Sequence, residues 1–143
     1  MRFAAVVLLS CCGGEVKHVV HENDGLLCLE GAQSIIGPRP VELIAGDSLA
    51  IQISWDTKLC SGCTSDLTTS CTATVDGDRI IVESLAEWDR EDSGLWSGWC
   101  SDNCNYPSTT CDTPPLFADD YILSHGEGTL AFTVPGTVDP ACL

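Results

Sequence analysis

The stretch Ser48-Leu49-Ala50-Ile51-Gln52-Ile53-Ser54-Trp55 decides the fold class of this chain. Large apolar residues alternate along it with small or polar ones, and this period predicts a half-buried β-strand. The strand places four apolar side chains on one face: Leu49, Ile51, Ile53 and Trp55. A sheet with one apolar face needs a second layer to cover it, so this stretch favours a two-layered β architecture.

Short strand patterns recur after this stretch, and two pairs of them predict hairpins. In residues 71–83, Asp76-Gly77-Asp78 separates two β-rich runs, and an Asp-Gly at that place is a strong hairpin signal. In residues 121–134, His125-Gly126-Glu127-Gly128 separates two more such runs. Residues 84–90 are expected to add one or two helical turns at most. Because no long stretch has helical spacing, we expect an all-β, antiparallel β-sandwich.

Two local motifs resemble those of immunoglobulin-like domains. Gly46-Asp47-Ser48-Leu49-Ala50-Ile51-Gln52-Ile53 is similar to their strand B. Glu91-Asp92-Ser93-Gly94-Leu95-Trp96 is similar to the approach to their strand F, with Trp96 in place of the usual tyrosine. The resemblance implies an immunoglobulin-like antiparallel β-sandwich. It implies no shared disulfide, since Ile53 and Gly98 stand where that family pairs two cysteines.

The chain of 143 residues contains ten cysteines, and most of them are expected to form disulfides. Eight follow the N-terminal segment: Cys28, Cys60, Cys63, Cys71, Cys100, Cys104, Cys111 and Cys142. Disulfides persist in oxidising compartments, so the cysteine content predicts an exported protein. We expect Cys28 to pair with Cys142. The other six form two three-cysteine loops, for which we expect one bridge inside each loop and one between the loops.

The N-terminal segment has the order of an export signal. Arg2 precedes the apolar run 3–9, followed by Ser10 and Cys11, and this order is typical of such signals. Leu8-Leu9-Ser10-Cys11 resembles the lipobox of bacterial lipoproteins, in which the signal is cut before an acylated cysteine. The resemblance implies a signal peptide at 1–10, a lipid on Cys11 and a membrane as partner.

The same resemblance places the protein in the cell envelope, periplasmic or at the cell surface. An ordinary secretory signal, and hence a secreted protein, is the alternative. If Cys11 carries the lipid, Cys12 is the odd thiol. We read residues 11–27 as a flexible tether and residues 28–143 as a single disulfide-rich domain with long disulfide-pinned loops.

Charge excludes one class of partner and suggests a weak metal site. The chain has 6 Lys and Arg against 21 Asp and Glu, a net charge of −15. Nucleic-acid binding needs a clustered basic surface, so we exclude it. Four carboxylates fall within six residues: Glu87, Asp89, Glu91 and Asp92. Because calcium prefers several oxygen ligands, these residues are a weak calcium candidate, with a solvated acidic loop as the alternative. No other cofactor is expected.

The remaining candidates favour binding over catalysis. Trp88, Trp96 and Trp99 form either part of the core or a platform for a ligand. Cys60-Ser61-Gly62-Cys63 has the spacing of a redox or zinc pair, but no strand-helix-strand pattern surrounds it. We therefore expect a non-enzymatic cell-envelope module that binds a protein or a glycan. A purely structural envelope component is the alternative, and a thiol-disulfide oxidoreductase is a distant one.

Overall fold

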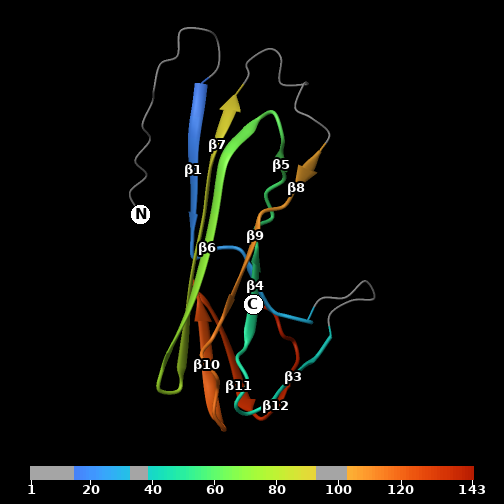
Figure 1. The fold of residues 1–143 in the computed structure, drawn as a ribbon, viewed down its shortest axis with the longest axis vertical. Helices are drawn as coiled ribbons and strands as arrows, with labels where there is room; N and C mark the ends of the chain where they lie inside the picture. The colour runs from blue at the N-terminus through green and yellow to red at the C-terminus, as the bar shows by residue number, and fades with distance from the viewer. Residues whose placement is uncertain (1–14, 33–38, 93–102) are drawn as a thin grey trace.

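The computed structural model describes residues 15–32, 39–92 and 103–143, and these residues form an all-β, sandwich-like fold (Figure 1). The strands are β1 (Glu15–Glu22), β2 (Leu26–Leu29), β3 (Val41–Leu43), β4 (Ala50–Ser54), β5 (Leu59–Cys60), β6 (Thr64–Asp76), β7 (Arg79–Asp92), β8 (Cys104–Asn105), β9 (Ser108–Asp112), β10 (Asp119–His125), β11 (Gly128–Val134) and β12 (Gly136–Val138). The all-β prediction is confirmed.

The first layer is a five-stranded sheet built around the long strand β7. One edge of β7 pairs with β6. The other edge is shared, because β1 pairs with residues 85–92 and β10 pairs with residues 79–82. β11 then pairs with β10. Every ladder in this sheet is antiparallel except β7–β10, which is parallel.

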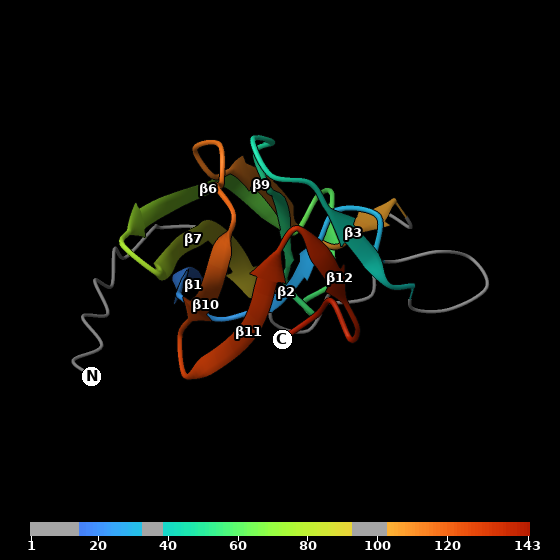
Figure 2. The ribbon, with the colours of Figure 1, turned by 90° about the horizontal axis from the view of Figure 1, so that it is seen from below.

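The second layer is the antiparallel sheet β2-β4-β9, while β12–β3 and β5–β8 are separate two-stranded pairs. Figure 2 shows β6, β7 and β10 on one side of the molecule, and β3 and β12 on the other. The C-terminal residues run beside β2. The Leu29 amide donates to the carbonyl of Ala141 and the Leu143 amide to that of Leu27, each at 2.8 Å.

The core lies between the two sheets, as the alternation in residues 48–55 predicts. All four apolar side chains of that face are buried: Leu49, Ile51, Ile53 and Trp55. The facing sheet contributes a buried set of its own: Ile80, Val82, Ala86, Trp88 and Leu123. Alternate residues of a strand point to one side, so this second set also follows directly from strand periodicity.

Both hairpins are confirmed, but the helical turns expected in residues 84–90 are wrong. β6 and β7 join through Gly77-Asp78, and β10 and β11 join through Gly126-Glu127. Residues 84–90 instead continue β7, with Ser84, Ala86 and Trp88 buried on one face. Two flanking strands satisfy the β7 backbone, and pairing of this kind overrides a weak helical propensity.

The flexible tether predicted for residues 11–27 does not describe residues 15–22, which form β1. This strand is antiparallel to β7, with Val19 opposite Trp88 and His21 opposite Ala86. Val19 and His21 are half-buried while Val16, His18 and Val20 are exposed. Val16 and Val19-Val20 carry only a weak signal for a short first strand, because apolar and polar residues do not alternate along this segment.

Three disulfides are defined, and they join segments far apart in the chain. Cys28–Cys142 is confirmed and spans 114 residues. Cys60–Cys104 and Cys71–Cys111 both connect the two three-cysteine loops. The expectation of one bridge inside each loop and one between them is therefore wrong. Cys60 and Cys104 are directly opposed on β5 and β8, so strand pairing decides the partner. Cys63 is also disulfide-bonded. Cys11, Cys12 and Cys100 lie outside the described residues.

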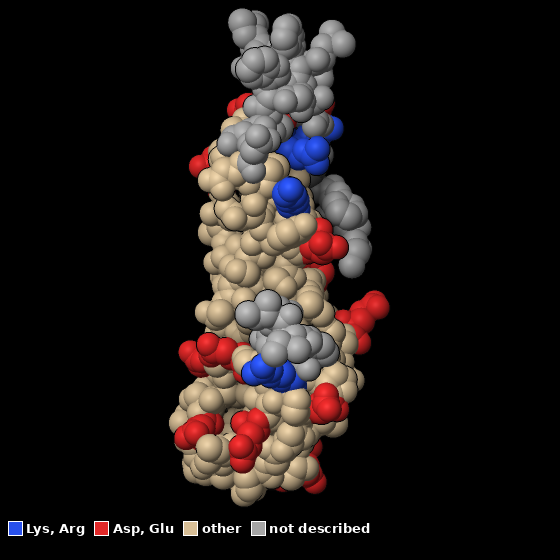
Figure 3. Space-filling model, turned by 90° about the vertical axis from the view of Figure 1, so that its right-hand side faces the viewer, with Lys and Arg blue, Asp and Glu red and all other residues tan. Residues whose placement is uncertain are grey.

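Charged side chains are spread unevenly over the molecule. On the face shown in Figure 3, a broad area without Lys, Arg, Asp or Glu lies between charged groups nearer the two ends. Four exposed or half-buried uncharged side chains belong to the outer face of β4 and β9: Gln52, Ser54, Ser108 and Thr110.

Candidate functional site

An open groove lies where β1, β2, β4 and the segment before β9 meet, and it encloses about 710 Å³. Its volume falls within the range of small-ligand sites. The lining residues are His21, Asp24, Gly25, Leu26, Ser54, Trp55, Asp56, Thr57 and Tyr106. A second hollow of about 350 Å³ lies beside β3 and Leu116. The first groove has the more varied chemistry, because it combines aromatic rings, carboxylates and hydroxyl groups.

The turn Asn23-Asp24-Gly25 between β1 and β2 forms one wall of the groove. The Asn23 amide donates to the Ser84 carbonyl, and the Ser84 amide donates to Asn23 Oδ1, each at 2.9 Å. Asn23 has a φ of 52°, a left-handed conformation that asparagine tolerates. These bonds fix the turn to β7 in the opposite layer, so this wall is rigid.

Gly25 is required in this turn by both its backbone conformation and its surroundings. Its φ is +103°, and a Cβ atom here would lie 2.9 Å from the Ser54 carbonyl oxygen. The same atom would lie 3.2 Å from Cδ1 and Nε1 of Trp55. Only glycine combines a positive φ with the absence of a Cβ atom, so the close approach of β2 to β4 depends on it.

The Asp24 carboxylate is held by two aromatic side chains. The Trp55 indole Nε1–H donates to Asp24 Oδ1 at 2.8 Å. His21 Nδ1 lies 2.7 Å from Asp24 Oδ2. The His21 ring in turn stacks on the buried Trp88 ring, with centroids 5.0 Å apart. The Asp24 side chain is nevertheless 51% exposed. A fixed carboxylate therefore faces solvent at the groove.

Tyr106 and Leu26 supply exposed apolar surface on the groove. Tyr106 is 57% exposed and Leu26 is 45% exposed. Tyr106 stands between β8 and β9, and the carbonyl of the next residue, Pro107, accepts the Trp55 amide at 3.1 Å. The disulfide Cys60–Cys104 anchors β8 just before it. An aromatic side chain is thus displayed from a segment that is fixed on both sides.

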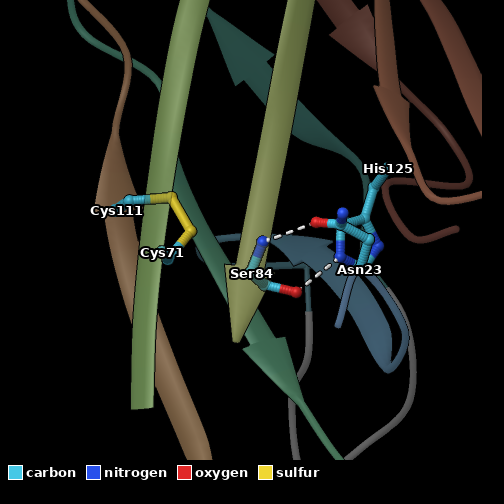
Figure 4. The surroundings of a disulfide bond; sticks show 5 residues. All are labelled: Asn23, Cys71, Ser84, Cys111 and His125. Atoms are coloured by element: carbon cyan, nitrogen blue, oxygen red, sulfur yellow. Dashed lines mark hydrogen bonds between the residues drawn. A yellow bond between two sulfur atoms is a disulfide. The ribbon is translucent and has the colours of Figure 1, made fainter. Parts of the chain in front are cut away.

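A buried polar contact lies beneath the Asn23 turn, beside the disulfide Cys71–Cys111 (Figure 4). Ser84 Oγ lies 2.9 Å from His125 Nε2, and each residue is 6% exposed. Burial lowers the pKa of His125 from 6.5, and the negative charge of Asp24 opposes this effect. Neither residue lines either hollow. We therefore interpret the pair as a structural link between β7 and β10, and not as a serine–histidine catalytic pair.

The predicted calcium cluster is not assembled in the described part of the chain. Among those residues, no group of three or more His, Cys, Asp or Glu side chains is placed to hold a metal ion. The region is the strand β7 and not a loop. Glu87, Asp89 and Glu91 are alternate residues on it, and such residues lie about 7 Å apart along a strand. Asp89 instead lies 2.7 Å from His18 Nδ1 on β1.

Of the two alternatives for the tryptophans, the core is confirmed and the ligand platform is wrong for Trp88, which is 2% exposed. Trp96 and Trp99 lie outside the described residues, as does the predicted lipidation site Cys11. The alternative of a Cys60–Cys63 redox pair is also wrong, because Cys60 bonds to Cys104. A redox pair of this spacing requires its two sulfurs to bond to each other.

Sequence reasoning missed the residues of the groove. Asn23-Asp24-Gly25 stands between two apolar pairs, Val19-Val20 and Leu26-Leu27, and this is a turn signal between two strands. Reading the segment as a tether concealed that signal. Nothing in the sequence indicated Tyr106, because its place on the same groove as Asp24 depends on how the two layers pack.

Comparisons with known proteins identify no relative. No protein-family model, curated protein or solved structure matches the chain. Within the described ranges, there is no helix with the length and apolar character needed to cross a membrane.

Proposed function

We propose that this protein is a non-enzymatic binding module of the cell envelope that recognises a protein or a glycan through the groove at Asp24 and Tyr106. The observation that carries the proposal is an exposed aromatic ring and a fixed carboxylate on one open groove of about 710 Å³. Pockets that combine apolar surface with a few fixed polar groups are typical ligand sites.

The rigidity of the groove supports binding. The Ser84 amide and the Trp55 indole donate hydrogen bonds to Asn23 Oδ1 and Asp24 Oδ1, and a disulfide anchors β8 beside Tyr106. A site that is ordered before the ligand arrives loses less conformational entropy on binding.

An envelope location rests on sulfur chemistry and on the N-terminal resemblance. The defined disulfides favour an oxidising compartment. The lipobox-like Leu8-Leu9-Ser10-Cys11 supports a lipid anchor. Intact mass spectrometry of the protein from its native membrane tests this, since a diacylated Cys11 adds a characteristic mass. A mature chain that begins elsewhere and lacks lipid contradicts the anchor. We also propose that the β-sandwich belongs to the immunoglobulin-like class, on the resemblance of residues 46–53 and 91–96.

A purely structural envelope role is the second candidate, and the burial of Trp88 favours it. A buried tryptophan contributes to the core and offers no surface to a ligand. The structural role requires no ligand, so a direct binding measurement separates the two candidates.

The test is a binding screen of the full chain against immobilised glycans and peptides, with two matched variants. Tyr106→Ala removes the exposed ring on the groove. Phe117→Ala removes a ring that is 76% exposed but does not line the groove. We expect a ligand whose binding is measurably weakened by Tyr106→Ala and unchanged by Phe117→Ala. Equal loss in both variants, or no ligand at all, refutes the binding role.

A further inference from the structure

The charge of the groove is one-sided. Asp24 and Asp56 line it, and neither Lys nor Arg does; the one basic side chain among its described lining residues is His21, which pairs with Asp24 at 2.7 Å when it is protonated. Lys58 follows the lining residue Thr57 in sequence but is not part of the lining. The whole chain carries a net charge of −15, and such a field steers cationic partners toward the surface. Charge complementarity therefore favours a positively charged ligand.

The geometry of Asp24 suits a forked donor. A carboxylate has about four lone-pair positions on its two oxygens. The Trp55 indole occupies one position on Oδ1, and His21 occupies one on Oδ2. Each oxygen thus retains capacity for a second donor. The arginine guanidinium presents paired N–H groups in a plane that matches a carboxylate.

The apolar surface suits the rest of an arginine side chain. Tyr106 and Leu26 are 57% and 45% exposed, and both line the same groove as the carboxylates. A guanidinium stacks on an aromatic ring through cation–π attraction, and its aliphatic stem packs on apolar surface. An uncharged sugar would use the ring but would not benefit from the two carboxylates in the same way.

We infer that the partner is a protein with a basic segment, and that an arginine of this segment enters the groove between Tyr106 and the Asp24 and Asp56 carboxylates. This inference rests on the proposed binding function and names the chemistry of its ligand. The guanidinium forms charge-assisted hydrogen bonds with Asp24 and stacks on Tyr106. Its flanking residues occupy the remaining length of the groove.

The test measures binding of the full chain to a tetra-arginine peptide and to a tetra-citrulline peptide by calorimetry. Citrulline has the shape of arginine without its charge. We expect the citrulline peptide to bind at least about tenfold more weakly, and the arginine peptide to weaken as salt is raised. Equal affinity for the two peptides overturns the inference.

Single substitutions distinguish binding of the peptide in the groove from its attraction to the acidic surface as a whole. Asp24→Asn and Asp56→Asn should each weaken the arginine peptide by about threefold, the effect of one partly exposed charge pair. Tyr106→Ala should weaken it by about threefold through the lost cation–π contact. Asp112→Asn removes the same charge from an exposed position on β9 outside the groove, and it should have no comparable effect. Equal effects of Asp112→Asn, Asp24→Asn and Asp56→Asn refute the assignment to the groove. Because Asp56→Asn removes no hydrogen bond assigned here, it keeps the test decisive if Asp24→Asn is unstable.

Two further outcomes are distinguishable. A glycan that binds and depends on Tyr106, with no binding of tetra-arginine, overturns this inference and leaves the proposed function standing. If neither a glycan nor any peptide binds, both are wrong.

Discussion

Replacing Gly25 by alanine tests the close approach of β2 to β4 that forms the floor of the groove. The added Cβ atom meets the Ser54 carbonyl oxygen at 2.9 Å and the Trp55 ring at 3.2 Å, at a φ of +103°. Gly46 is a matched control, because its φ is +94° and nothing lies within 4 Å of its added Cβ atom. The two variants share the cost of a left-handed alanine and differ only in the contact.

The magnitude follows from these two contributions. A left-handed alanine costs about 1–2 kcal/mol, and stiffening of the unfolded chain offsets about 0.4–1 kcal/mol of this. Gly46→Ala should therefore lower the unfolding free energy by about 1 kcal/mol. Overpacking typically adds about 1–3 kcal/mol. The loss of unfolding free energy caused by Gly25→Ala should therefore exceed that caused by Gly46→Ala by this amount.

The assay is thermal unfolding of both variants without reductant, followed by circular dichroism. For a chain of this size, 1 kcal/mol corresponds to about 4 °C in Tm. Gly25→Ala should therefore melt about 4–12 °C below Gly46→Ala. Equal melting temperatures would show that the Ser54 carbonyl and the Trp55 ring move away from the added Cβ atom without loss of stability. The reasoning about a rigid groove floor would then be refuted.

Three further predictions concern the core, the chain ends and pH. Trp88→Ala should lower the unfolding free energy by about 3–5 kcal/mol, whereas Ile81→Ala at an exposed site of the same strand should cost far less; similar losses in urea unfolding would contradict the core assignment. The double variant Cys28→Ser/Cys142→Ser should be less stable by about 2–5 kcal/mol, and unchanged unfolding would argue against the bridge. Burial lowers the pKa of His125 from 6.5. Below pH 6.5 the unfolded chain therefore binds more protons at this histidine than the folded chain does. The contribution of the neutral His125 to the stability of the fold is thus lost as the pH falls from 6.5 toward the folded pKa. His125→Gln should remove this part of the pH dependence, so urea unfolding at pH 7.5 and pH 5 should show a larger stability loss in the natural protein; parallel losses would exclude His125 as a cause.

Local periodicity predicts much of the fold because it needs no knowledge of distant segments. The alternation around Ile51 and Ile53 identifies a buried face, and Asp76-Gly77-Asp78 identifies a hairpin. The same period runs through residues 84–90. There, the apolar spacing was weaker because Ser84 replaces an apolar residue on the buried face. The buried serine is explained only by its partner His125, from a different strand.

The candidate site follows a different rule, since its residues are distant in sequence. Asp24 is fixed by Trp55, and Tyr106 joins them from a third segment. The disulfide pairs show the same dependence. Cys60 and Cys104 are paired because β5 and β8 lie side by side, and neither strand has a pattern strong enough to predict its neighbour.

The sequence by itself determined the strand-rich class, the two hairpins, the buried face of residues 48–55 and the pairing of Cys28 with Cys142. These features depend on the alternation of apolar and polar residues, on the residues that form turns, and on the positions of the first and last cysteines of residues 28–143. Only the tertiary structure decided that residues 15–22 join a sheet, which loop cysteines pair, and that Asp24 and Tyr106 share a groove. The physical reason is that strand neighbours and layer contacts are chosen by the packing of the whole chain, and local sequence carries no record of that choice.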